Sequence, residues 1–300
     1  MTALGAWRKF VMTANEKEQM MIDDILDFMR LAGDIARGAQ NHLDASANYL
    51  KAESVTSVVT AADLEISQLF RQFVARRFAD TDYVIIDEES LNTLGEDKWQ
   101  RINQAEYQFI IDPIDGTLPY SCSQALYGIS VGIFRRGKPC CGALYMPATR
   151  ELACFDGAEV RLVREAFQPE EETEVLQPQI RCSCPIIFGH PWNTPLTEDF
   201  KLSETVFVNY YSAVVQLLYL VTQRARAYAF YMSIWDLAGG WAIGRAMGLR
   251  LYRLQDGQEI TELSAADFDD NLHLKSVCVM CRSDDLAYVQ KILEVAPRLR

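Results

Sequence analysis

The residues best suited to chemistry are two aspartates, Asp112 and Asp115, in the segment 112–117 (Asp-Pro-Ile-Asp-Gly-Thr). The apolar, β-prone run 107–111 directly before them predicts a buried strand, so both carboxylates leave the same strand end. Two negative charges held this close repel each other unless a cation lies between them. Oxygen ligands with no histidine or cysteine beside them favour Mg²⁺ over zinc or copper. The segment therefore predicts a magnesium site.

Two residues that follow the aspartates are suited to binding phosphate. Gly116 and Thr117 offer backbone N–H groups, and Thr117 adds a hydroxyl, just beyond the expected metal. Amides at a turn or at a helix N-terminus are a common anion site. A phosphate held next to a divalent cation is the ligand that this order of residues favours.

Two more carboxylates stand in the same local context. Glu88 follows the predicted strand 83–86, and Asp236 follows an apolar run and begins a helix rich in Gly and Ala. Each has a simpler interpretation, a solvated strand end for Glu88 and a helix N-cap for Asp236. Open α/β sheets bind ligands at their strand ends, which would bring these distant segments together. We expect one acidic site, with the simpler interpretations left open.

The elements that must position these residues follow from apolar periodicity. It predicts helices over 16–50, 63–78, 212–222, 236–247 and 284–295 and strands over 83–86, 107–111, 151–155, 180–188, 225–232, 249–254 and 277–281. A hairpin is predicted around 135–138, and the acidic stretch 165–179 is predicted as a surface loop. Alternating elements of this kind favour a layered α/β fold. We expect residues 1–146 to form an N-terminal α+β lobe with most metal ligands, and residues 147–300 to form a C-terminal α/β lobe that adds Asp236.

Composition narrows the class of protein. The 300 residues are 49% hydrophobic and carry a net charge of −12, which allows a large core and argues against binding nucleic acid or an anionic membrane. No apolar run could span a bilayer, and the start lacks the long apolar stretch of a signal peptide. With eight cysteines expected to be reduced, we expect a cytoplasmic protein. The pairs Cys182/Cys184 and Cys278/Cys281 are expected to pack in strands, with a Cys₄ zinc site as the alternative.

Four segments, in order, resemble the inositol monophosphatase family of Mg²⁺-dependent phosphatases. They are residues 58–63 (Val-Val-Thr-Ala-Ala-Asp), 87–90 (Asp-Glu-Glu-Ser), 112–117 and 235–240 (Trp-Asp-Leu-Ala-Gly-Gly). The order and spacing match the family over residues 20–295. The resemblance implies a five-layer α-β-α-β-α sandwich, two or three Mg²⁺ ions and a homodimer.

The resemblance also implies roles for particular residues. The implied metal ligands are Glu88, Asp112, Asp115, Asp236 and the backbone carbonyl of Ile114. Thr117, helped by Glu88, would orient or deprotonate the attacking water, and Asp63 would support a weaker third metal. The amides of Gly116 and Thr117 would hold the phosphate. Lys51 lies near a lysine of some family members, one residue out of register.

The side that would bind the alcohol departs from the family pattern. Asp87 replaces a glycine of many members, and Tyr211 replaces the glycine of the usual Gly-Ser-Ala, here Tyr211, Ser212 and Ala213. Residues 227–232 lack the acidic residue that inositol-phosphate enzymes use on a sugar hydroxyl. We expect Tyr211, Ser212, Ala213, Phe230 and Asp236 on the substrate side. The aromatic residues there are either plain core or the lining of a flatter, more apolar pocket.

The function implied is a Mg²⁺-dependent phosphomonoesterase acting on a small hydroxylated metabolite through a metal-activated water, with Li⁺ inhibition expected from the resemblance. Two cations about 3.5–4 Å apart can both activate water and stabilise the leaving oxygen, so no covalent nucleophile is needed. The alternatives within the superfamily are a 3′(2′),5′-bisphosphate nucleotidase, a histidinol-phosphate phosphatase and a fructose-bisphosphate phosphatase. A non-catalytic regulatory homologue is the alternative from another class.

Overall fold

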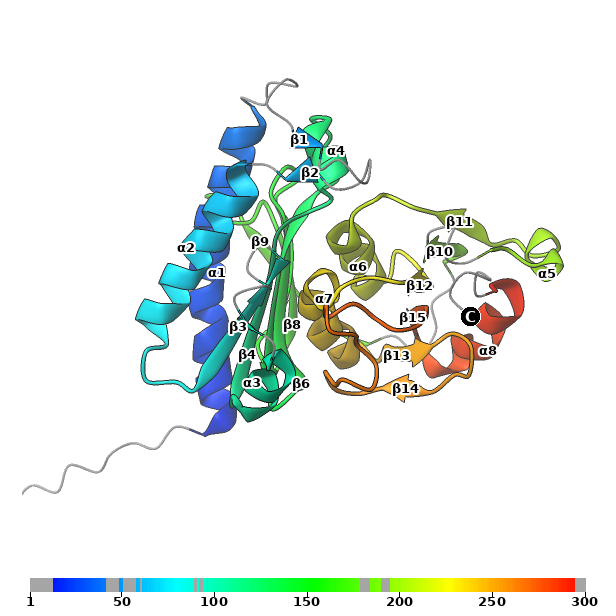
Figure 1. Ribbon diagram of the computed structural model, residues 1–300. Helices are drawn as coiled ribbons and strands as arrows, with labels where there is room; N and C mark the ends of the chain where they lie inside the picture. Colours follow the sequence, from blue (N-terminus) through cyan, green and yellow to red (C-terminus); the bar gives the residue numbers. More distant parts are fainter. Residues whose placement is uncertain are drawn as a thin grey trace, which may run out of the picture.

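Two β-sheets with helices between and outside them make up the described part of the chain (Figure 1). The structure is a computed structural model that describes residues 13–41, 49–50, 58–59, 61–88, 91, 94–95, 97–178, 184–189 and 195–294. Among these residues, no helix is both long and apolar enough to cross a membrane.

The first sheet has seven strands in the order β3-β4-β5-β6-β7-β8-β9. Their bounds are β3 (Tyr83–Asp87), β4 (Tyr107–Asp115), β5 (Gly128–Arg135), β6 (Lys138–Met146), β7 (Glu151–Phe155), β8 (Val160–Arg164) and β9 (Glu172–Leu176). Strands β3 and β4 are parallel and the other neighbours are antiparallel. The expected hairpin is confirmed, since Arg136 and Gly137, with φ values of 50° and 78°, join β5 to β6 as the two central residues of a tight turn.

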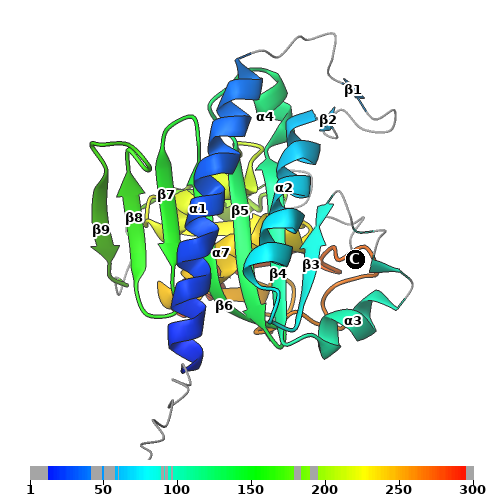
Figure 2. The same ribbon diagram turned by 90° about the vertical axis from the view of Figure 1, so that its left-hand side faces the viewer.

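Two long helices cover one face of this sheet (Figure 2). They are α1 (Ala14–Gln40), which begins with a capping box between Thr13 and Glu16, and α2 (Ala61–Arg77). Their apolar faces and the sheet enclose a core that includes the fully buried rings of Phe28, Phe70 and Phe109. Two short helices, α3 (Lys98–Gln104) and α4 (Thr117–Ser121), flank the two ends of β4.

The opposite face of the first sheet packs on α6 (Ala213–Val221) and α7 (Ile234–Ala246), and these helices in turn pack on the second sheet (Figure 1). The second sheet has the order β11-β10-β12-β15-β13-β14. Its strands are β10 (Ile186–Gly189), β11 (Val206–Val208), β12 (Ala227–Phe230), β13 (Arg250–Arg253), β14 (Glu259–Ile260) and β15 (Cys278–Cys281). Helices α5 (Glu198–Lys201) and α8 (Leu286–Ile292), the latter after a 3₁₀ turn (Ser283–Asp285), lie outside it. The expected five-layer sandwich is thus confirmed.

Helix α7 lies against β5 and β6 with almost no side chain between them. A Cβ atom added at Gly132 would come 2.6 Å from Ala238, and one added at Gly142 would come 2.2 Å from the carbonyl oxygen of Gly239. Only glycine allows the helix backbone to approach the strands this closely. This close contact explains why the 235–240 segment contains small residues. Asp236 belongs to the same helix, so the contact also sets its position against the sheet.

Two expectations about local structure differ from the structure, and others concern residues outside its described part. The helix expected over 16–50 ends at Gln40, and β1 (Tyr49–Leu50) instead pairs antiparallel with β2 (Val58–Val59). The segment 165–179, expected to be a loop, contains a strand, β9. This strand pairs with β8 at the edge of the first sheet and carries exposed acidic residues. Charged residues on an edge strand oppose pairing with another chain. Residue Lys51 and residues 179–183, which include Cys182, lie outside the described part, whereas Cys278 and Cys281 are buried in β15.

The expected division after Met146 falls between β6 and β7, two neighbours in one sheet. The first sheet continues to Leu176, and the first strand of the second sheet begins at Ile186. We therefore propose that the two lobes divide between these two strands.

Candidate active site

An irregularity in β4 brings two carboxylates to one face of the first sheet. Asp112 opposes Ser130 of β5, and Asp115 opposes Gly128, so Pro113 and Ile114 together face a single residue of β5. Residues three apart in a regular strand point to opposite faces. The additional residue of this β-bulge restores a common direction. Asp112 and Asp115 consequently lie close together, while Ile114 packs in the core under α1 and α2.

Helix α7 supplies the third carboxylate. Asp236 is in the first turn and accepts a 3.0 Å hydrogen bond from the Ser233 amide, which makes it part of a capping box. Its carboxylate also lies with those of Asp112 and Asp115 in a group in which one oxygen from each residue lies within 4.8 Å of the other two. The N-cap of α7 is thus Ser233 and not Asp236, which supports the cap from the third position of the helix while it also joins the carboxylate group.

The three carboxylates disturb one another's ionisation. Burial, followed by the charges of Asp115, Asp236 and Glu88, holds the pKa of Asp112 well above its usual value. Burial and neighbouring charges raise the pKa of Asp236 to about 8. Burial raises the pKa of Asp115 to about 6, against the opposing effect of the hydrogen bonds it accepts. A side-chain hydrogen bond between the Asp112 and Asp236 carboxyls adds to the raised pKa of Asp112 and opposes the rise in the pKa of Asp236.

The cluster fits a hard divalent cation. Oδ1 of Asp112 is buried and has no hydrogen-bond partner within the described residues. A buried carboxylate oxygen without a donor is costly unless a cation approaches it. Three carboxylates with no sulfur or imidazole ligand among them suit Mg²⁺ or a similar ion.

The start of α6 is attached to Asp115. The Ser212 hydroxyl donates to Oδ2 of Asp115, and the amides of Ala213 and Val214 donate to its two oxygens at 3.0 and 2.7 Å. Gly116 donates its amide as well. Ser212 and Ala213, expected on the substrate side, thus contact a carboxylate of the cluster directly. Each carboxylate oxygen has two lone pairs, so these four donors match the four lone pairs of Asp115, and a metal at Asp115 would share its oxygens with them.

Glu88 lies outside this close group. It follows β3 and is exposed, although its charge still raises the pKa values of Asp112 and Asp236. Asp87, the residue before Glu88, is fully buried. The Asp87 carboxylate accepts hydrogen bonds from the Ser67 hydroxyl at 3.0 Å and from the Arg71 guanidinium at 2.7 Å. This anchor of β3 to α2 was not predicted. Its signal was the polar spacing of Ser67 and Arg71, four residues apart in an amphipathic helix.

The remaining predicted residues occupy the rim of the cluster. Asp63 is buried in the first turn of α2, outside the close group, and its charge contributes to the raised pKa of Tyr120. Thr117 begins α4 and is half-buried. Gly116 precedes it with a φ of 80°, and a Cβ there would lie 2.8 Å from Cβ of Ser212. This position therefore requires glycine for its conformation and for its space.

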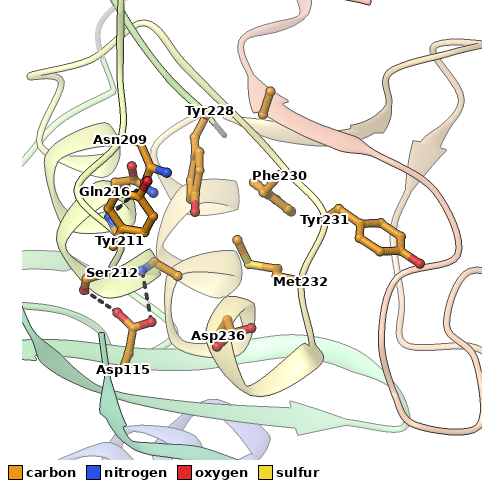
Figure 3. A pocket seen from close by; sticks show the side chains of 13 residues that line it. Asp115, Asn209, Tyr211, Ser212, Gln216, Tyr228, Phe230, Tyr231, Met232 and Asp236 are labelled. Atoms are coloured by element: carbon orange, nitrogen blue, oxygen red, sulfur yellow. Dashed lines mark hydrogen bonds between the residues drawn. The ribbon is translucent and has the colours of Figure 1, made fainter. Parts of the chain in front are cut away.

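A pocket of about 310 Å³ opens beside the cluster (Figure 3). Asp115 and Asp236 lie at one end of it, and aromatic side chains from β12 and from the loop before α6 form its walls (Figure 3). Its full lining is Asp115, Gly189, Asn209, Tyr211, Ser212, Ala213, Gln216, Tyr228, Ala229, Phe230, Tyr231, Met232 and Asp236. Tyr211 and Phe230 are thus brought to the pocket as predicted. Tyr228 is one of the aromatic residues expected to be either plain core or pocket lining, and it lines the pocket. Asn209 and Gln216 were not predicted; a lone amide in the apolar helix 213–221 was the available signal for Gln216.

Comparison with known proteins agrees with the motifs. The model of a family described as the inositol monophosphatase family matches residues 27–267. The chain is 27% identical over 229 residues to "Nus factor SuhB" of Vibrio cholerae, covering 71% of this chain and 80% of that protein. It is 28% identical over 167 residues to "Inositol-1-monophosphatase" of Bacillus subtilis, covering 52% and 59% respectively. A solved structure described as an "IMPase/NADP phosphatase complexed with NADP and Ca2+ at pH 7.0" shares the fold, with a TM-score of 0.70, 19% identity and coverage of 91% and 95%.

Proposed function

Because the chain belongs to the inositol monophosphatase family, we propose that it is a Mg²⁺-dependent phosphatase that hydrolyses the phosphate monoester of a small alcohol. The family supports a phosphatase, as do relatives named inositol-1-monophosphatase and 3′(2′),5′-bisphosphate nucleotidase. The observation that carries the proposal is the group of Asp112, Asp115 and Asp236 at one end of a pocket. A site that neutralises phosphate charge beside a space for the alcohol suits ester hydrolysis.

We assign metal binding to the three clustered carboxylates, Asp112, Asp115 and Asp236, with Glu88 and the carbonyl of Ile114 as further ligands from the family pattern. Bound Mg²⁺ supplies positive charge for the phosphate oxygens and for an attacking water. The start of α6 orients Asp115 through three donors, which keeps both of its oxygens directed into the site.

The other residues act on the phosphate and the water. The Thr117 hydroxyl orients the water, and Glu88 accepts its proton as the general base. The Thr117 amide holds a phosphate oxygen, and the Gly116 amide, which donates to Asp115 here, would have to turn from that carboxylate to hold another. Asp63 supports a further, weaker cation. The released alcohol lies in the pocket lined by Tyr211, Phe230 and their neighbours.

The test is phosphate release from a panel of phosphate esters in Mg²⁺ and in EDTA. We expect release that EDTA abolishes and that Asp112→Asn lowers by at least about 10²-fold, because the variant removes a ligand charge while keeping the shape of the side chain. Circular dichroism of the variant checks that its fold is intact. An active, correctly folded Asp112→Asn protein, or release undiminished by EDTA, would contradict the proposal.

A second candidate is a phosphatase-like protein that acts by binding a partner. Similarity to a protein named Nus factor SuhB favours it, as does the position of Glu88 outside the close group. A stoichiometric protein partner, together with no release from any ester by Mg²⁺-loaded protein, would support this candidate over the enzyme.

A further inference from the structure

Flat aromatic side chains form much of the wall of the pocket beside the carboxylates, alternating with polar groups. Tyr228 and Phe230 alternate along β12, so both side chains point to the same face of the second sheet, toward the pocket (Figure 3). Their rings lie 4.8 Å apart at 60°, and both residues are buried. Tyr231 and Met232 extend this wall. Tyr211 approaches from the loop before α6 on the other side (Figure 3).

The pocket also has polar side chains, and part of their hydrogen-bonding capacity is already used within the protein. Oδ1 of Asn209 accepts from the Tyr211 amide at 2.8 Å, and Oε1 of Gln216 accepts from the Tyr210 amide at 3.0 Å. Gln216 also hydrogen-bonds the Tyr228 side chain. Their carbonyls therefore brace the loop that carries Tyr211.

Among the described residues that line the pocket, none has a positively charged side chain. Asp115 and Asp236, which belong to the metal cluster, are the charged groups among the described residues of its lining. A second phosphate on the substrate would need a cation or several donors at this end of the site. A polyol would leave its hydroxyls against Phe230 and Met232, where they cannot replace the hydrogen bonds they make to water.

From these walls we infer that the substrate is the monophosphate of a small alcohol carrying one flat, mostly apolar ring. The volume of about 310 Å³ is at the lower end for ligand sites, which suits a single ring. Aromatic rings prefer offset or edge contacts with other rings, and Tyr228, Phe230 and Tyr211 offer them on two sides. The inference rests on the proposed phosphatase function and gives that function a substrate class.

The backbone conformation of Tyr211 supports a ligand-binding role for its ring. Its φ is 56°, in the left-handed region that glycine adopts without cost and a bulky residue avoids. Tyr211 is also 49% exposed, so burial in the core contributes little free energy to offset the cost of this conformation. A ring held at the mouth of the pocket in a costly conformation is expected where the ring contacts a ligand.

The test compares kcat/KM for three monophosphates in Mg²⁺: benzyl phosphate, cyclohexylmethyl phosphate and inositol 1-phosphate. Benzyl and cyclohexylmethyl alcohols are leaving groups of similar acidity, so their ratio reports on the flatness of the ring. We expect benzyl phosphate to exceed inositol 1-phosphate by at least about tenfold, and to exceed cyclohexylmethyl phosphate by a smaller factor. Fructose 1,6-bisphosphate and a nucleoside 3′,5′-bisphosphate serve as probes for a second phosphate.

Two variants examine the wall. Phe230→Leu keeps apolar volume but removes the flat ring, and Tyr211→Gly removes the other ring; each should lower the benzyl to cyclohexylmethyl ratio toward one. Phe200→Leu removes a ring from α5, outside the pocket, and should leave that ratio unchanged. Tyr211→Gly should not lower Tm, because glycine relieves the left-handed backbone.

The outcomes separate the inference from the function on which it rests. If no ester in the panel is hydrolysed, the phosphatase function itself is wrong. If hydrolysis depends on Mg²⁺ but inositol 1-phosphate or a bisphosphate equals or exceeds benzyl phosphate, the function stands and the inferred substrate class is wrong. An unchanged benzyl to cyclohexylmethyl ratio in both wall variants would overturn the inference as well.

Discussion

The hydroxyl of Ser212 donates a hydrogen bond to the carboxylate of Asp115, which joins the first turn of α6 to the end of β4. The same hydroxyl accepts from the Val215 amide at 3.2 Å, so it also caps the helix. The Ser212 side chain therefore fixes the orientation of Asp115, a proposed metal ligand, and the start of α6, a helix that lines the pocket. Any change at this contact should affect the metal site and the alcohol site together.

Ser212→Ala should weaken metal binding more than it weakens the fold. Loss of a hydrogen-bond partner behind a metal ligand typically costs about 10–100-fold in metal affinity or activity. We expect the Mg²⁺ concentration for half-maximal phosphate release to rise by that order. Loss of the cap should cost about 0.5–2 kcal/mol of stability. The control is Thr197→Ala, which removes the cap of α5 and should leave the Mg²⁺ titration unchanged.

Gly116→Ala should destabilise the protein by about 1–3 kcal/mol, because the new methyl would meet Ser212 and the backbone is left-handed. The matched control is Gly38→Ala in α1, where a Cβ has nothing within 4 Å. Alanine favours a helix, so this control should be neutral or gain up to about 1 kcal/mol. Urea unfolding of both variants measures the difference, and equal stabilities would contradict the steric argument.

The metal-free protein should become less stable as pH rises from about 5.5 to 8.5. The unfolded chain releases the protons of Asp115 and Asp236 near pH 4, whereas burial raises their pKa values in the folded chain to about 6 and about 8. Folding therefore binds protons in this range, and the stability that these groups contribute is lost as pH rises through the folded pKa values. Tm in EDTA should fall, by roughly 2–4 °C for each kcal/mol.

Asp236→Asn should flatten this dependence on pH, since it removes the carboxyl whose pKa burial raises to about 8. Added Mg²⁺ should have its largest effect on Tm at the alkaline end, because it binds the ionised carboxylates. A Tm in EDTA that rises steadily from pH 5.5 to 8.5 would show that the carboxylates are not the groups that dominate the titration.

Arg71→Met should lower both stability and turnover. The buried Asp87 carboxylate would lose its guanidinium partner, which we expect to cost about 1–3 kcal/mol. Turnover should fall as well, since the next residue in the chain is Glu88. The double variant Arg71→Met/Asp87→Asn should recover most of the stability. Arg76→Met on the same helix, which loses only an exposed bond to the Gln72 carbonyl, is the control.

The sequence locates the acidic residues well because each follows an apolar run that periodicity detects. It places Asp112 and Asp115 at the end of a strand, and Asp236 at the start of a helix, without knowing that a bulge and a glycine contact bring them together. Those two features depend on pairing with β5 and β6, which are separate segments of the chain. Local pattern carries no information about such pairing.

Strand β9 shows the same limit in another form. Its acidic residues and the proline before it are typical of a loop, yet it pairs with β8, where Arg164 forms an ion pair with Glu174 at 3.0 Å. The partner overrides the local preference. Asn209 and Gln216 were missed for a related reason, since their contacts to the loop 210–211 exist only once α6 has docked.

The position of α7 between the sheets has a consequence for synthesis of the chain. The seven strands of the first sheet end at Leu176, some sixty residues before α7 begins at Ile234. Until α7 leaves the ribosome, the face around Gly132 and Gly142 is uncovered, with Leu144 and Met146 among the apolar side chains on it. A nascent chain that exposes this apolar face of the first sheet is prone to aggregation, and we expect a chaperone to bind it. The three carboxylates meet only when α7 closes on the sheet, so the growing chain cannot acquire this metal-binding group before α7 has been made.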